Sequence, residues 1–257
     1  MELLRFMNIF IISIIFTIVF NINDQLLITF GQFVPSTRHT ASSEIIGDRL
    51  YVIGGGVSLA GTFATAKVSR EVIYLDLSKN FNINSPPWVN YSNISPLPVY
   101  GAWVGSCKDK NNKTIYLFGG ELYDVSTNNL ITDNNKQLYV FDSVKNTWTT
   151  PVVTGTLAPA RRREMKVVMD DLGKMYVFGG GADSTTGSNI TMTFNDTTIF
   201  NSNLLTWTTA NPPNLPTGRV DFTATYLPKN KLIIYIGGIE LRTDEFSYYV
   251  NIKEVAN

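Results

Sequence analysis

The sequence of 257 residues has one histidine, one cysteine and few charged residues. A single histidine, His39, argues against almost every metal centre or catalytic triad, and its place beside Arg38 favours a structural or solvated side chain. A single cysteine, Cys107, excludes an internal disulfide framework, and without a histidine to activate it the thiol is expected to be inert. Lys plus Arg and Asp plus Glu balance at 21 each, so no basic field is available for nucleic acid.

Patterns typical of helices are almost absent after residue 30, whereas Asn, Ser, Thr, Tyr and Phe are plentiful. This composition suits many short strands joined by polar loops, so we expect an all-β fold. The length allows one large all-β domain or two ordinary ones.

An apolar run at residues 9–20 follows Arg5 near the N-terminus. The run is shorter than the roughly 20 residues that span a bilayer and matches the hydrophobic region of a signal peptide. Cleavage after Gly31 leaves Gln32 as the new N-terminus. Residues 1–31 are therefore predicted to be a signal peptide, with an uncleaved membrane anchor or a buried N-terminal strand or helix as the alternatives.

Five Asn-X-Ser/Thr sequons would accept glycans in the secretory pathway: Asn90, Asn93, Asn112, Asn189 and Asn195. Because the chain is so rich in asparagine, serine and threonine, about four sequons are expected by chance. The sequons therefore permit secretion without arguing for it.

The clearest pattern is an apolar, strand-like run that ends in two glycines and occurs four times. The pairs are Gly54 and Gly55, Gly119 and Gly120, Gly179 and Gly180, and Gly237 and Gly238. A glycine pair lets the backbone leave a strand through conformations that a Cβ atom forbids. Four copies at steps of 65, 60 and 58 residues indicate a repeat architecture, which favours one continuous array.

Each unit carries further features in a constant order around its glycine pair. An inner strand of small, alternating residues precedes the pair, and a strand ending in Asp or Asn follows it. A tryptophan then marks a fourth strand at Trp88, Trp148 and Trp207. The units span about residues 38–90, 100–150, 160–209 and 218–257. In the fourth, the third strand is expected near residue 257, although residues 246–250 serve if the loop is shorter.

This order of features resembles the kelch repeat, in which each unit is one four-stranded blade of a β-propeller. The resemblance implies that residues 32–257 form an all-β propeller with three complete blades and one partial blade. Rings usually contain four to eight blades, so we expect either a longer propeller or an unusual closure in which residues 26–30 supply an outer strand.

The layout, with its signal-like leader, is similar to that of secreted or membrane-anchored kelch proteins related to the galactose oxidase central domain. A copper site of that kind needs two histidines, two tyrosines and a cysteine crosslinked to one tyrosine. One histidine cannot meet that requirement, so the resemblance implies the fold and not the activity. We expect no cofactor, no metal and no catalytic residue.

Two features are candidates for ligand binding. Arg38, Arg162 and Arg219 each precede an inner strand near one end of the propeller channel, where they would bind a carboxylate or an acidic peptide. The structural alternative is that they donate hydrogen bonds to carbonyls of neighbouring blades. Long polar loops follow every glycine pair at the same end of each blade, and loops on a rigid scaffold often form binding surfaces: 57–70, 121–136, 181–196 and 239–250.

The sequence therefore predicts a non-catalytic module that binds a protein or a glycan, in the secretory pathway or at the cell surface, with possible membrane attachment through the N-terminal segment. Two alternatives remain. One is a fragment of a galactose-oxidase-like or other carbohydrate-active enzyme, and the other is a cytoplasmic kelch adaptor.

Overall fold

The computed structural model describes residues 32–58, 66–155, 158–210, 215–241 and 247–249. These residues form short strands and two 3-10 turns, η2 (Asn134–Lys136) and η3 (Ser184–Thr186), so the all-β prediction is confirmed. The predicted leader, residues 1–31, and the closing strand at residues 26–30 lie outside the described residues. Among the described residues, no helix is long and apolar enough to cross a membrane.

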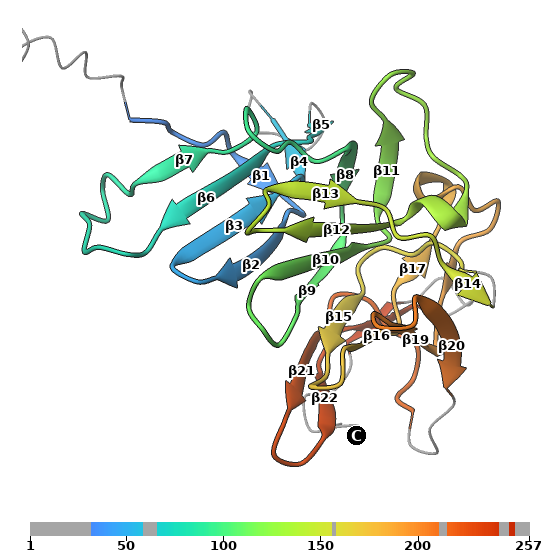
Figure 1. The fold of residues 1–257 in the computed structure, drawn as a ribbon. Coiled ribbons are helices and arrows are strands. Elements are labelled where there is room, and N and C mark those ends of the chain that lie inside the picture. The colour runs from blue at the N-terminus through green and yellow to red at the C-terminus, as the bar shows by residue number, and fades with distance from the viewer. Residues whose placement is uncertain (1–31, 59–65, 156–157, 211–214, 242–246, 250–257) are drawn as a thin grey trace, which may run out of the picture. The chain divides into compact units, whose positions relative to one another are not determined.

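The first three units each form an antiparallel sheet in chain order (Figure 1). Unit one contains β2 (Ser42–Ile46), β3 (Arg49–Ile53), β6 (Val72–Asp76) and β7 (Trp88–Asn90). Unit two contains β9 (Gly105–Lys108), β10 (Thr114–Phe118), β12 (Leu138–Asp142) and β13 (Thr147–Thr149). Unit three contains β15 (Lys166–Met169), β16 (Lys174–Phe178), β19 (Thr197–Asn201) and β20 (Thr206–Ala210). A fifth strand, β14 (Thr154–Gly155), pairs in parallel with β20.

Unit four contributes one described hairpin, β21 (Thr223–Leu227) and β22 (Leu232–Ile236). The strand β24 (Ser247–Tyr249) pairs with β23 (Ile239–Leu241) and not with β22. The expectation that residues 246–250 form the third strand of this unit is therefore wrong. They belong instead to the loop that follows the glycine pair.

The Asp or Asn that ends each third strand starts the turn into the fourth. Asp76 Oδ1 accepts the Ser78 N–H at 2.9 Å, and Asp142 Oδ1 accepts the Val144 N–H at the same distance. Asn201 forms the equivalent bond in unit three. Short polar side chains favour such turns because they accept a backbone N–H two residues further on. This explains why the outer strands keep a constant spacing.

The hydrophobic core consists of layers between successive sheets. Between units one and two, the Tyr51 ring lies 5.6 Å from that of Phe141, which packs 4.9 Å from Trp148. Between units two and three, Trp207 packs at 5.1 Å from both Phe118 and Phe200. The tryptophan of each outer strand therefore covers the unit before it. These aromatic contacts bury large apolar surfaces and hold neighbouring sheets together.

The glycine pairs form the joints between units. The N–H of the second glycine donates to a carbonyl at the start of the next unit, at 2.8 Å for Gly120 to Arg162 and 2.9 Å for Gly180 to Arg219. The first glycine lets that carbonyl come close, since a Cβ on Gly119 would lie 2.5 Å from the Arg162 oxygen. Both glycines of every pair also have positive φ. Close approach and backbone conformation therefore both require glycine here.

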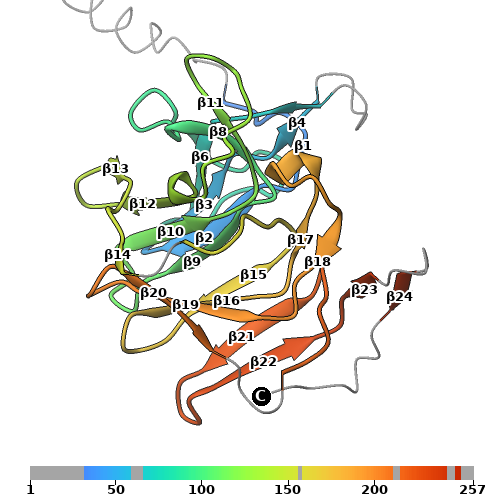
Figure 2. The same cartoon turned by 90° about the vertical axis from the view of Figure 1, so that its right-hand side faces the viewer.

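The loops after the glycine pairs form a second set of small sheets. Their first strands are β4 (Gly56–Val57), β11 (Glu121–Asp124), β17 (Gly181–Ala182) and β23. Each pairs with the residues that precede the inner strand of its own unit, which include β1 (Arg38–His39) and β8 (Val99–Ala102). The loops of units one and three add β5 (Lys67–Val68) and β18 (Met192–Thr193). Figure 2 shows β4, β17 and β23 on the right of the main sheets.

Neighbouring loop sheets also contact one another. β5 contacts β8, β11 contacts η3, and β18 contacts β23. The predicted loops therefore form one continuous layer across the described part of the four units.

The joint predicts that two equivalent glycines differ in their tolerance of a methyl group. In Gly119→Ala, the new Cβ overlaps the next unit, whereas a Cβ on Gly237 would meet nothing within 4 Å. Both positions have positive φ, 69° and 71°, so both variants should lose about 1–2 kcal/mol of folding free energy from the backbone alone. We expect Gly119→Ala to lose roughly 1–3 kcal/mol more through overpacking. Urea unfolding measures both losses, and equal losses would contradict the joint.

Candidate functional site

The inner ends of the four units enclose a pocket that contains one equivalent residue from each. These residues are Thr40, Trp103, Glu164 and Asp221, and the pocket has a volume of about 310 Å³. Each lies two or three residues before an inner strand, and β2, β9, β15 and β21 lie side by side in that order. Backbone bonds join the four positions in pairs, from the Trp103 N–H to the Thr40 carbonyl at 2.9 Å and from the Asp221 N–H to the Glu164 carbonyl at 3.1 Å. We call this set the inner pocket.

All four residues of the inner pocket have left-handed backbone conformations, with φ between 54° and 60°. A residue with a Cβ pays about 1–2 kcal/mol for that conformation, and the cost is notable for threonine and tryptophan. Because the same conformation occurs in every unit, the repeat architecture imposes it. The side-chain types nevertheless differ completely from unit to unit, so this position is free to take on a role other than folding.

Charged groups line one side of the inner pocket. The Arg163 guanidinium forms ion pairs with Glu164 at 2.8 Å and with Asp183 at 2.7 Å. It also lies 5.3 Å from the centre of the Trp103 ring. Burial raises the pKa of Glu164, Arg163 opposes that rise, and the Asp221 and Asp183 carboxylates add to it. The pocket therefore combines an aromatic face with two carboxylates, of which Asp221 is exposed.

The predicted arginine positions lie two residues before the inner pocket and point into the protein. Arg162 and Arg219 each keep 1% of their surface exposed, and the Arg38 side chain keeps 9%. Each donates to the carbonyl of the first glycine of its own unit: 3.3 Å to Gly54, 3.3 Å to Gly179 and 3.2 Å to Gly237. The arginines thus buttress the glycine joints from within their own blades, and this placement favours the structural alternative over ligand binding.

An acidic residue just before the third strand completes the arrangement in two units. Arg38 forms an ion pair with Glu71 at 2.6 Å, and Arg162 pairs with Asp196 at 2.6 Å. In unit two the arginine is replaced by Gly101 and the acid by neutral Gln137, which donates to the Pro159 carbonyl at 2.6 Å. Arginine and acid are therefore present together or absent together, as expected for a buried charge that needs its partner.

The remaining residues singled out from the sequence are distributed over the fold. Trp88 and Trp148 are half-buried in outer strands, and Trp207 is buried. The sequon residues Asn93, Asn189 and Asn195 are exposed, whereas Asn90 and Asn112 are half-buried.

The single cysteine and the single histidine lie in the interior of their units. Cys107 is buried, and burial raises the pKa of its thiol well above the usual value. The ring of His39 packs over Gly56, where an added Cβ would lie 2.4 Å from Nε2. Among the described residues, no group of three or more His, Cys, Asp or Glu side chains is arranged to hold a metal ion.

Comparison with known proteins agrees with this architecture. Residues 38–253 match the family described as the KLHDC2/KLHL20/DRC7 Kelch-repeats domain. The chain belongs to the kelch-repeat family. It is 29% identical over 196 residues to Kelch domain-containing protein 3 of Bos taurus, and the match covers 74% of this chain and 45% of that protein. The chain therefore spans less than half the length of this curated relative. Kelch-repeat membership indicates a protein-interaction module.

The sequence analysis predicted the kelch fold and missed the inner pocket. The signal was available, because Thr40, Trp103, Glu164 and Asp221 follow the arginine position, or Gly101 in its place, by two residues in every kelch unit. Their dissimilar chemistry concealed the equivalence, since repeats are recognised by what recurs.

The inner pocket predicts an abnormal titration of Glu164. Because burial raises its pKa in the folded protein, the stabilising contribution of this carboxyl is fully present below the unfolded pKa and is lost as pH rises through the folded pKa. Carboxyl-carbon NMR should give a value above that of an ordinary glutamate. Asp221→Asn should lower it and Arg163→Met should raise it. Asp48→Asn, in the exposed turn between β2 and β3, serves as the control and should leave it unchanged.

Proposed function

We propose that this kelch module is a non-catalytic binding protein whose inner pocket takes hold of a protein partner. The observation that carries the proposal is the inner pocket itself, where four equivalent positions share one strained backbone conformation but differ in chemistry. Strained backbone positions gather at binding sites on otherwise regular scaffolds. The surrounding layer of loop sheets would extend the contact surface.

The chemistry of the inner pocket favours a partner segment that offers hydrogen-bond donors next to an apolar or cationic group. Glu164 and Asp221 supply acceptors, and the half-buried Trp103 ring supplies a face for packing or for a cation. An aromatic ring flanked by carboxylates also suits a sugar, whose hydroxyls donate to the acids while its ring packs on the indole. A glycan ligand is therefore the second candidate.

Differential capture from cells that make the protein tests the first candidate. Proteins retained by the wild type should be lost with Trp103→Ala and with Asp221→Asn, and should be kept by Val144→Asp, a matched control in an exposed turn of unit two. With purified components, Trp103→Ala should weaken binding at least tenfold, because aromatic residues dominate interface energies. Partners that bind all four proteins equally would contradict a role for the inner pocket. Binding by free glycans alone would favour the second candidate.

We further propose that the protein enters the secretory pathway and acts there or at the cell surface. Support comes from the signal-like leader and from the exposure of three sequon residues, Asn93, Asn189 and Asn195. A glycan needs an accessible asparagine, so the two half-buried sequons should be modified less.

Expression in a eukaryotic cell tests this setting. We expect a new N-terminus near Gln32 and a loss of mass on enzymatic deglycosylation. Asparagine-to-glutamine variants at the three exposed sites should remove most of that loss, whereas Asn90→Gln should remove little. An unglycosylated cytosolic protein with an intact leader would favour the adaptor alternative.

A further inference from the structure

We propose that unit four is an acceptor for β-strand addition, in which a segment of a separate polypeptide pairs with β22 and inserts aromatic side chains into the cavity beside it. This surface is distinct from the inner pocket, and the inference does not depend on the function proposed above.

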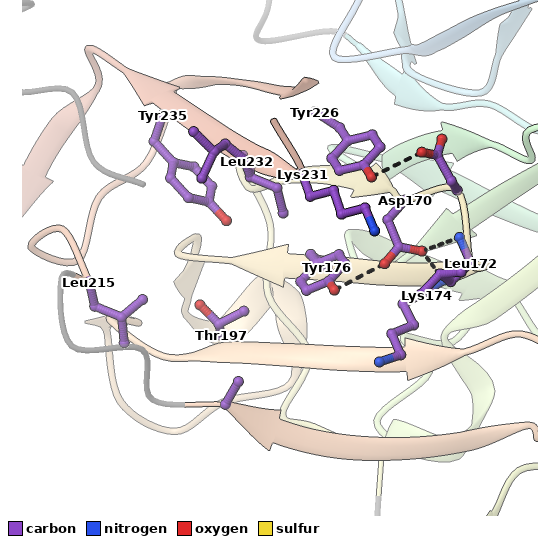
Figure 3. Close-up of a pocket in the computed structure, with 13 residues that line it drawn as sticks. Asp170, Leu172, Lys174, Tyr176, Thr197, Leu215, Tyr226, Lys231, Leu232 and Tyr235 are labelled. Atoms are coloured by element: carbon purple, nitrogen blue, oxygen red, sulfur yellow. Dashed lines mark hydrogen bonds between the residues drawn. The ribbon is translucent and has the colours of Figure 1, made fainter. Parts of the chain in front are cut away.

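The cavity lies between units three and four and has a volume of about 500 Å³. Tyr176 and Thr197 line it from unit three, and Ile233 and Tyr235 line it from β22. Figure 3 shows the Tyr176, Thr197 and Tyr235 side chains around a common space, with Leu215 at one end. Asp170 holds the Tyr176 hydroxyl at 3.1 Å, so the wall at the other end is fixed by a hydrogen bond.

The preceding interface shows what fills the equivalent space. There, the unit-two positions that correspond to Phe178 and Thr197 are Phe118 and Leu138, and both are buried under unit three. The covering residues include Phe200 from the third strand and Trp207 from the fourth. The same two strands carry Phe141 and Trp148 over unit one. The internal template for the cavity is therefore a phenyl group and an indole on two adjacent strands.

The described part of unit four supplies less cover. Phe178, Phe222 and Tyr235 form the buried cluster at this interface, and it is smaller than the clusters at the two interfaces before it. Thr197 is 4% exposed, and its hydroxyl has no hydrogen-bond partner among the described residues. A buried hydroxyl without a partner is costly, so a polar group on an incoming strand would be stabilised here.

The edge of β22 completes the acceptor. The second strand of every other unit is paired on both sides: β3 with β2 and β6, β10 with β9 and β12, β16 with β15 and β19. Within the described residues, β22 pairs with β21 alone. An open edge next to an apolar cavity is the arrangement used in β-strand addition, where backbone bonds give affinity and side-chain pockets give specificity.

A peptide with the sequence of residues 196–209, the third and fourth strands of unit three, is the direct probe because it carries Phe200 and Trp207 at their natural spacing. Added to the 257-residue protein, it should bind saturably by calorimetry and slow amide hydrogen exchange in β22. Peptides with Phe200→Ala or Trp207→Ala should bind at least tenfold more weakly.

Two protein variants locate the binding. Leu232→Asp, on β22 and in the cavity wall, should reduce peptide affinity at least tenfold. Leu204→Asp, in an exposed turn of unit three, should leave it unchanged. Circular dichroism and thermal unfolding establish that both are folded. Trp103→Ala, in the inner pocket, should bind the peptide normally, which separates this inference from the proposed function.

Three results would overturn the inference. The first is an absence of saturable binding by the peptide. The second is binding that Leu232→Asp does not weaken. The third is β22 amides already protected in the free protein, either because other residues of this chain cover them or because a second copy does, as a dimer in solution would reveal.

Discussion

The hydrogen bond from the second glycine of each pair to the next unit is the contact on which the array depends. It forms at 2.8 Å from Gly55 to Gly101 and recurs at the following two interfaces. It exists because two glycines in succession let the neighbouring carbonyl approach without meeting a Cβ atom. The aromatic layers contribute far more buried area, but they require this spacing of the sheets. Backbone geometry thus sets the distance that the apolar side chains then fill.

The arginine network stabilises the same joint from the other side. A buried guanidinium is costly unless its charge is paired and its donors are satisfied, and in units one and three both conditions hold. Unit two shows that the arrangement is optional, because Gly101 is surrounded there by Leu97 and Leu122 instead of a guanidinium. An apolar filling and an ion pair are therefore two solutions to one packing problem within a single chain. A ligand-binding role for these arginines has no comparable support from their contacts.

The sequence predicted what the repeat forces to recur and missed what it leaves free. The glycine pairs, the Asp or Asn that ends each third strand and the tryptophans recur because backbone conformation, turn geometry and inter-sheet packing each admit few residue types. The fold was therefore predictable. The inner pocket was not, because Thr40, Trp103, Glu164 and Asp221 share only a left-handed conformation, and no residue type signals that conformation apart from glycine and, more weakly, asparagine and aspartate. The orientation of Arg162 and Arg219 was equally hidden, since spacing alone does not reveal which way a side chain turns.

The two candidate surfaces arise from the same constraint at different places in the array. At the inner pocket the joint brings together positions from all four described units and fixes their backbones, so chemistry varies on a rigid frame. At unit four the joint has no described successor: Gly238 accommodates the Val220 carbonyl of its own unit, whereas a Cβ on Gly237 would meet nothing within 4 Å. A repeat whose units are stabilised by their neighbours has its least covered interface where described neighbours run out. The inner pocket therefore offers a preformed polar site, and unit four offers backbone and apolar surface shaped by the repeat itself. A ligand of the first is selected by side-chain chemistry, and a ligand of the second by its resemblance to the outer strands of this chain.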